Sequence, residues 1–210
     1  MLLAFTVRHL VLASWEVSPG QVARNLPRGL EPALVDGRSA LVSIVGFRNE
    51  DVRLGGRRVP SFSQLNVRTY VTRAGEPAVF FLSLRVTPLG LGGVLFGAPF
   101  RPARVRVREG TVRAPGLGIS LQYRVSGGSP AVPGFETGPL GAHDVGYFEA
   151  AGLRRLVAEH EPFAWQGAEL VAPPRLDPVL ALGFDAREPD SLLYAASTGF
   201  RAELPPRKVA

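Results

Sequence analysis

Hydrophobic and polar positions alternate over short stretches of this chain, in the pattern that is typical of β-strands. The clearest case is residues 63–71, "SQLNVRTYV", which predict a strand with two unlike faces. The apolar face carries Leu65, Val67, Thr69 and Val71, and the opposite face carries Gln64, Asn66, Arg68 and Tyr70. The polar face meets either water or an interior, and the choice separates a plain β domain from a protein with a polar pocket.

Other stretches predict further strands, separated by Gly- and Pro-rich turns. They cover residues 3–15, 39–47, 78–86, 103–108, 111–113, 118–125 and 191–198. Residues 153–160 and 164–171 predict a hairpin around Glu161-Pro162. Residues 126–141 predict a long Gly/Pro/Ser loop of the kind that is often functional or mobile.

Helix signals are few. Ser18 as N-cap and Pro19 at the first position predict a short helix that ends by Pro27. Residues 87–100 predict a second, poor helix, weakened by its glycines. The whole pattern predicts one mainly antiparallel β domain over residues 1–210, with two or three short helices and a frayed tail at 205–210.

Composition narrows the function classes. The formal charge is +6, and every one of the 24 basic residues except Lys208 is an arginine. The arginines are spread along the chain, densest at 103–108, so neither a nucleic-acid stripe nor a nucleic-acid partner is expected. With no Cys, thiolate chemistry is excluded. Few Asn and Gln beside many Pro and Arg suit a heat-adapted organism, although a GC-rich genome gives the same bias.

The first 17 residues are apolar, but Arg8 and His9 interrupt them and no charged segment precedes them. A signal peptide is therefore not expected. No run approaches 18 apolar residues, so no membrane span or membrane partner is expected, and a cytoplasmic location is the default.

The order of several motifs resembles the YqjF-like family, a group of uncharacterised conserved proteins in the acetoacetate decarboxylase-like superfamily. The most specific parts are the segment at 12–47 with its "LPRGL" and "DG" elements, and "NVRTYV" at 66–71. "FFLSL", "HDVGYF", "VAEHEPFAW" and "SLLYAASTGFRAEL" follow in the family's order. The resemblance implies a strongly curled sheet or β-barrel around a central cavity.

In the decarboxylases that cavity holds a Schiff-base lysine, on a segment resembling Gly-aromatic-Pro-Lys-Lys. The corresponding string here is "GAPFR", with Phe100 in the place of the nucleophilic lysine and Arg101 in the place of its neighbour. Asn66 falls where the decarboxylases carry a catalytic glutamate. An Arg cannot form a Schiff base, and Lys208 lies near the chain end behind two prolines. Lysine-dependent decarboxylation is therefore not expected.

In a closed barrel, Asn66, Arg68 and Tyr70 would line the interior. A buried arginine needs an anionic partner. Two alternatives stay open, a bound acid or a structural ion pair with Glu50, Glu149 or Glu159. Phe100 and Arg101 complete the predicted ligand-binding set, with Arg101 suited to grip a carboxylate or phosphate.

His143, Tyr147, Glu159 and His160 are the candidate catalytic residues. A His with a carboxylate partner can act as a general base. Glu159 and His160 are adjacent, so in a strand they point to opposite faces. No recognised metal-ligand spacing is present, and neither a metal nor a cofactor is expected.

Three hypotheses follow. The first is a protein that binds a small anionic molecule in the cavity, and the second is a non-covalent acid/base enzyme of lyase or isomerase type in the same place. The third is a protein-interaction domain whose cavity is filled by side chains. A pocket of roughly 300 Å³ or more favours the first two. The superfamily resemblance also suggests a homo-oligomer, such as a dimer.

Overall fold

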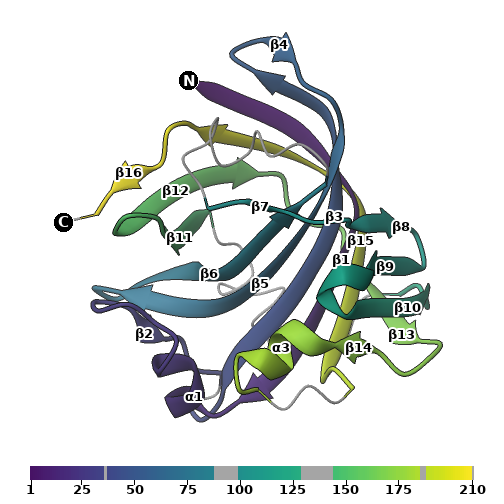
Figure 1. Ribbon diagram of the computed structural model, residues 1–210, viewed down its shortest axis with the longest axis horizontal. Helices are drawn as coiled ribbons and strands as arrows, with labels where there is room; N and C mark the ends of the chain where they lie inside the picture. The colour runs from purple at the N-terminus through teal and green to yellow at the C-terminus, as the bar shows by residue number, and fades with distance from the viewer. Residues whose placement is uncertain (36, 88–98, 129–143, 185–187, 210) are drawn as a thin grey trace.

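Long strands dominate the computed structural model, which describes residues 1–35, 37–87, 99–128, 144–184 and 188–209. A ring of strands curls around a common interior (Figure 1). Its strands are β1 (Leu2–Val17), β3 (Ala40–Leu54), β5 (Phe62–Arg73), β6 (Glu76–Val86), β11 (Val145–Glu149), β12 (Leu153–His160) and β15 (Ser191–Glu203). The predicted mainly β, acetoacetate decarboxylase-like fold is confirmed.

The curled sheet closes on itself into a barrel. The hydrogen-bonded order runs β12-β11-β6-β5-β3-β1-β15, and β12 pairs in turn with β15. The pairing between β11 and β6 is parallel, and the other pairings around the ring are antiparallel. Closure gives each of these strands one face toward an interior and one face outward.

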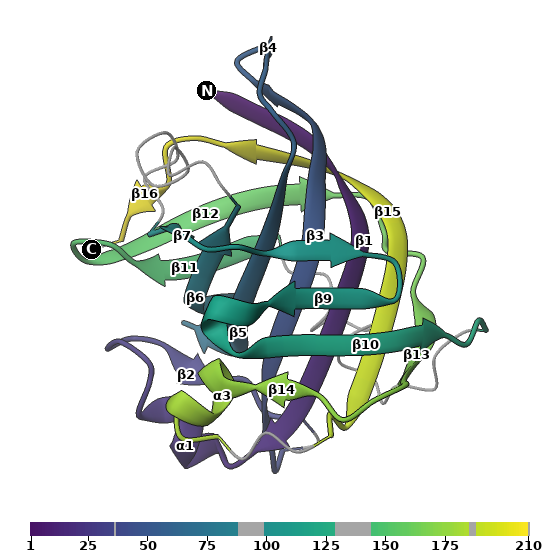
Figure 2. The same ribbon diagram turned by 45° about the vertical axis from the view of Figure 1, so that its right-hand side comes forward.

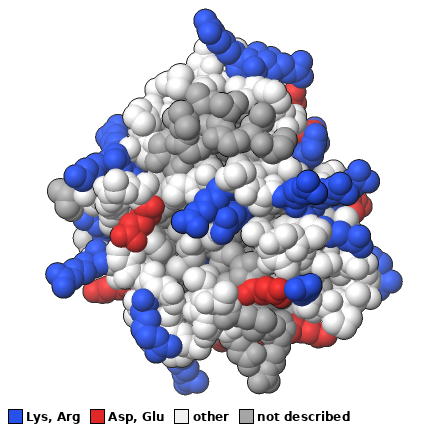
Figure 3. All heavy atoms as spheres, in the orientation of Figure 1, with Lys and Arg blue, Asp and Glu red and all other residues white. Residues whose placement is uncertain are grey.

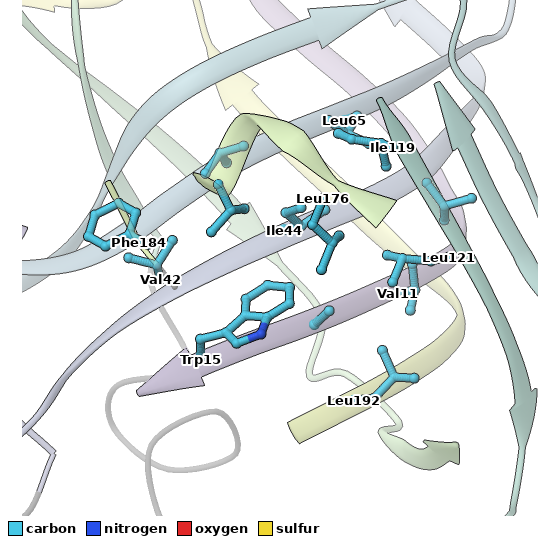
Figure 4. Packing of buried hydrophobic residues seen from close by; sticks show 14 of the residues in the cluster. Val11, Trp15, Val42, Ile44, Leu65, Ile119, Leu121, Leu176, Phe184 and Leu192 are labelled. Atoms are coloured by element: carbon cyan, nitrogen blue, oxygen red, sulfur yellow. The ribbon is translucent and has the colours of Figure 1, made fainter. Parts of the chain in front are cut away.

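A smaller sheet covers the outside of β1, β3 and β5, as Figure 2 shows. Its strands are β8 (Arg106–Arg108), β9 (Thr111–Ala114), β10 (Ile119–Val125), β13 (Gln166–Leu170) and β14 (Arg175–Leu176). The largest hydrophobic core lies between the two layers, where Val11, Ile44 and Leu65 of the barrel meet Ile119 and Leu121 (Figure 4). This second layer explains why the sequence of β3 is apolar on both faces.

The remaining elements are short. They are α1 (Pro19–Ala23), β2 (Glu31–Pro32), β4 (Arg57–Arg58), β7 (Arg101–Pro102), the 3₁₀ helix η1 (Pro115–Leu117), α3 (Asp177–Ala181) and β16 (Arg207–Lys208). The helix predicted after Ser18 is present as α1, and the backbone N–H of Ser18 donates to Gln21 Oε1 at 3.2 Å. The predicted helix at 87–100 and the predicted loop at 126–141 lie largely outside the described residues.

One predicted pairing is wrong, and the chain end differs from its expectation. β12 pairs with β11 and β15, whereas β13 pairs with β10 and β15, so the two strands around Glu161-Pro162 do not form a hairpin. The intervening turn instead carries the chain from the barrel to the outer sheet. At the C-terminus, where a frayed tail was expected, Arg207 and Lys208 form β16 and pair with β12.

Charged residues lie in several separate groups on the face shown in Figure 3, with Arg and Lys interspersed with Asp and Glu. Within the described ranges, no helix is both long and apolar enough to cross a bilayer.

Candidate functional site: a cavity inside the barrel

The polar face of β5 points into the barrel. Gln64, Asn66 and Arg68 line an interior cavity of about 160 Å³, together with apolar side chains from the strands around it. Leu65 and Val67, the alternating neighbours, pack outward into the core beneath the small sheet. The cavity is smaller than the roughly 300 Å³ typical of drug-sized ligands, so it suits only a small molecule.

Arg68 is held in place by a chain of three hydroxyl groups, those of Tyr70, Ser43 and Ser14. Its Nη2 donates to Tyr70 Oη at 3.1 Å, and its guanidinium carbon lies 5.3 Å from the centroid of the Tyr70 ring. Tyr70 Oη lies 3.2 Å from Ser43 Oγ, which lies 2.7 Å from Ser14 Oγ. Tyr70, Ser43 and Ser14 are almost completely buried. The strand pairings that bring these residues together thus fix the guanidinium with neutral groups.

No carboxylate of the described residues lies within 4.0 Å of Arg68. The three candidate ion-pair partners lie elsewhere. Glu50 pairs with Arg48 at 2.8 Å and Arg8 at 3.7 Å, while Glu149 and Glu159 are exposed on β11 and β12. The described residues therefore give no structural ion pair to balance this charge.

Two buried polar atoms on the same face of β5 have no hydrogen-bond partner among the described residues, Arg68 Nε and Asn66 Oδ1. Asn66 is only 2% exposed. Buried polar groups are nearly always paired, because leaving one unpaired costs about 1–3 kcal/mol. Both residues line the cavity, so its wall holds a buried donor and a buried acceptor without partners from the described part of the chain.

His160 lies in another part of the cavity wall, with its side chain only 8% exposed. Its ring packs against Phe163 and Phe200, at centroid distances of 4.5 and 4.9 Å. Nδ1 lies 2.8 Å from the backbone oxygen of Glu161, and since that oxygen only accepts, Nδ1 carries the proton. In the neutral ring Nε2 is then the basic nitrogen, and it lies 3.9 Å from Asp144 Oδ1.

Close packing shapes the wall formed by β6 and β11. Gly146 of β11 lines the cavity, and a Cβ added to it would lie 2.6 Å from Cε2 of Phe81 on β6. The Phe81 ring therefore occupies the space that a side chain at position 146 would take. The absence of a side chain there sets how far this ring stands from the centre of the barrel.

The other predicted site residues are not all brought to the cavity. Phe100 lines it. Arg101 is exposed on β7 beside Arg85, whose pKa is lowered by burial and by the positive charge of Arg101. Tyr147 is buried in a separate cluster with Leu30, Val71, Ala78 and Phe80. Glu159 is exposed and does not line the cavity, whereas its neighbour His160 does. His143 lies outside the described residues.

Some residues that line the cavity were not predicted from the sequence. Gln64 was placed on the correct face but not among the candidates, and Asn49 and Asp144 also line the cavity. Ser14 and Ser43 are single polar residues in apolar runs, which is the only signal that could have indicated them. Among the described residues, no group of three or more acidic, His or Cys side chains could hold a metal ion.

Comparisons with known proteins agree with this architecture. The model of the family DUF2071, described as an uncharacterized conserved protein, matches residues 4–199. No match is found among curated proteins.

The similar solved structures all have the acetoacetate decarboxylase-like fold. The enduracididine biosynthesis enzyme MppR with HEPES bound is 15% identical, with a TM-score of 0.62 over 100% of this chain and 88% of that one. MppR complexed with pyruvate is 16% identical, with a TM-score of 0.58 over 99% and 90%. Acetoacetate decarboxylase from Legionella pneumophila subsp. pneumophila str. Philadelphia 1 is 15% identical, with a TM-score of 0.62 over 99% and 87%. At these identities the likeness concerns the fold alone.

Proposed function

Because this chain belongs to the DUF2071 family of uncharacterized conserved proteins and has the acetoacetate decarboxylase-like fold, we propose that its barrel binds a small carboxylate-type anion. Binding takes place without Schiff-base chemistry. The observation that carries the proposal is Arg68, a guanidinium held inside the barrel with no carboxylate partner among the described residues.

The charge of Arg68 defines the class of ligand. An arginine that faces a largely apolar cavity is stabilised by an anion, and its fork of N–H donors matches the two oxygens of a carboxylate. Tyr70 accepts one N–H of Nη2, and Nε has no partner among the described residues. The remaining N–H groups of the guanidinium are donors for a ligand oxygen. The guanidinium is thus preorganised to meet an acid.

The size of the cavity limits the ligand further. A cavity of about 160 Å³ is comparable to the engineered apolar cavity of about 150 Å³ that holds benzene. Walls formed by side chains such as Phe47, Phe81 and Phe163 suit a short hydrocarbon chain. A small carboxylic acid with a few carbon atoms fits both limits, and the complex of MppR with pyruvate offers an analogy of similar size.

The proposal excludes an amine-dependent reaction. Lys208 is the only lysine, and it is exposed on β16, paired across from Arg154 of β12. Phe100 lines the cavity where the resemblance places the nucleophilic lysine. A Schiff base needs a desolvated primary amine beside the substrate, which neither residue supplies.

A ligand screen by denaturant melts tests the proposal. Small carboxylic acids, keto acids, sugar acids and inorganic phosphate are each added to the wild type, to Arg68→Met and to Arg106→Met. A ligand at a hundred times its dissociation constant stabilises by about 2.7 kcal/mol. We expect a carboxylic acid to stabilise the wild type and Arg106→Met but not Arg68→Met.

Arg106 is the matched control because it is exposed on β8 in the outer sheet, and its loss changes the net charge equally. If no anion stabilises the wild type, or if both variants respond equally, the proposal is wrong.

A second candidate function, acid/base catalysis in the same cavity, is favoured by the position of His160. Its Nε2 is the basic nitrogen of the neutral ring, and the Asp144 carboxylate would stabilise the imidazolium formed on proton uptake. We expect His160→Gln to keep acid binding within about threefold and to abolish exchange of the α-proton of a bound keto acid in D₂O, measured by NMR. Equal exchange rates with and without wild-type protein would remove this candidate.

The cavity of about 160 Å³ is below the roughly 300 Å³ that favours the first two hypotheses, so the third, a protein-interaction domain, is tested by the same ligand screen. The superfamily resemblance supports a homo-oligomer such as a dimer, and light scattering of the purified protein tests this directly.

A further inference from the structure

The two unpartnered atoms of β5 need opposite hydrogen-bonding groups on a ligand. Arg68 Nε is a donor and needs an acceptor, whereas Asn66 Oδ1 is an acceptor and needs a donor. A simple carboxylate carries only acceptors at neutral pH. It therefore satisfies Arg68 and leaves Asn66 Oδ1 buried and unpaired.

We propose that the barrel selects a 2-hydroxy acid, with its carboxylate on Arg68 and its hydroxyl group on Asn66. This inference rests on the proposed function and specifies its ligand class. A hydroxyl group both donates and accepts, so it pairs with the amide of Asn66 while the neighbouring carboxylate accepts from Arg68.

The arrangement of the strand explains why the two polar groups must be close together on the ligand. Asn66 and Arg68 are alternate residues on one face of β5, about 6.6 Å apart along the strand. Both side chains reach the same cavity, and most of the remaining wall is apolar, with Val45, Phe81 and Leu156 as examples. One end of the ligand is thus polar and the other is hydrocarbon, as in a 2-hydroxy acid with a short branched chain.

The same argument disfavours a 2-oxo acid. A ketone oxygen only accepts, so it can take a hydrogen bond from Asn66 Nδ2 but leaves Asn66 Oδ1 unpaired. Asn66 also stands where the resemblance places a catalytic carboxylate, and an amide does not take up a proton near neutral pH. The position is therefore suited to recognise a hydroxyl group rather than to remove a proton from carbon.

Three acids with one carbon skeleton test the inference. They are 2-hydroxy-3-methylbutanoate, 2-oxo-3-methylbutanoate and 3-methylbutanoate, titrated calorimetrically into wild type, Asn66→Leu, Gln122→Leu and Arg68→Met. We expect the wild type to bind the hydroxy acid about tenfold more tightly than the other two, since an unpaired buried acceptor is costly. Asn66→Leu has a similar volume and no acceptor, and it should bind all three within about twofold of one another.

Gln122→Leu is the control for replacing an amide by leucine, because Gln122 lies on β10 in the outer sheet and does not line the cavity. It should keep the tenfold preference, while Arg68→Met should lose all three acids. If the three acids bind the wild type equally and Arg68→Met loses them, the hydroxyl inference is wrong and the proposed function stands. A preference that persists in Asn66→Leu also overturns the inference.

If folded wild type binds none of these acids but binds another anion through Arg68, only the inference falls. If it binds no anion at all, both proposals fall.

Discussion

The outward and inward faces of the barrel strands differ in how completely their side chains are packed. On the outward face, Ile44 and Val42 are 0% exposed and interlock with the small sheet through a continuous apolar core. On the inward face, the same strands border a cavity and carry Arg68 and Asn66 with unpaired atoms. The outward face therefore holds the fold together, whereas the inward face keeps a cavity and polar atoms that lack partners among the described residues.

A pair of leucines gives the largest expected difference. Leu65→Ala removes an outward side chain that is 1% exposed within the main core, and we expect a loss of about 4 kcal/mol in the free energy of unfolding. Leu10→Ala truncates a cavity-lining residue of β1, which has fewer contacts to lose, and we expect about 2–3 kcal/mol. Urea denaturation measures both. An equal or larger loss for Leu10→Ala would contradict the difference between the faces.

Two glycines, one at the contact with the small sheet and one at the cavity, test the same difference between the faces. A Cβ on Gly46 would lie 3.0 Å from both methyl groups of Val112, at the contact between β3 and β9. We expect Gly46→Ala to cost about 1–3 kcal/mol by overpacking and to leave anion binding intact. Gly146→Ala makes a closer contact, but with a Phe81 ring that borders empty space. We expect it to cost less stability and to weaken binding about tenfold as the ring turns into the cavity.

Both glycine variants are measured by urea denaturation and by calorimetric titration of the acid found in the screen. The comparison fails if Gly46→Ala weakens binding more than Gly146→Ala does.

The third prediction concerns the chain of hydroxyl groups from Tyr70, Ser43 and Ser14 that holds Arg68. Tyr70→Phe removes the acceptor of the Arg68 Nη2 bond and the partner of Ser43. We expect stability to fall by about 1–2 kcal/mol and the affinity for the anion to fall about fivefold, because the guanidinium is no longer fixed. Chemical denaturation and titration check the two effects. Unchanged affinity would show that Tyr70 contributes only to packing.

The smallest expected effect concerns Asn66 in the free protein. Asn66→Leu replaces an unpaired buried amide by an apolar side chain of similar volume, so stability without ligand should stay the same or rise by about 1 kcal/mol. Denaturant melts without ligand measure it. A loss above about 1 kcal/mol would mean that the amide already has a strong partner in the free protein.

The local alternation of residues and the family resemblance were enough to predict individual strands and a curled sheet. The alternation in β5 predicted two faces, and the resemblance predicted a curled sheet around a cavity, so the inward direction of Asn66 and Arg68 followed. The hairpin at Glu161-Pro162 failed because strand pairing between distant segments is not encoded in local periodicity. β12 and β15 lie side by side only once the sheet has curled round.

The site residues show the same limit. In β11, Gly146 lines the cavity and Tyr147 points outward. Neither composition nor spacing tells beforehand which of two neighbouring strand residues faces inward. Arg101 looked suited to an anion, but its place on β7 beside Arg85 leaves it exposed. Ser14 and Ser43 became visible as a pair only through the register between β1 and β3.

The closure between β12 and β15 has a consequence for motion. This seam consists of three residue pairs, and it includes His160 and Phe200, which both line the cavity. Local opening of so short a register disrupts far less structure than separating β1 from β15, which pair along nearly their whole length. We expect the backbone amides of this seam to exchange with deuterium faster than those of β1, and small solutes to enter and leave the barrel at this seam or at the parallel seam of two residue pairs between β6 and β11.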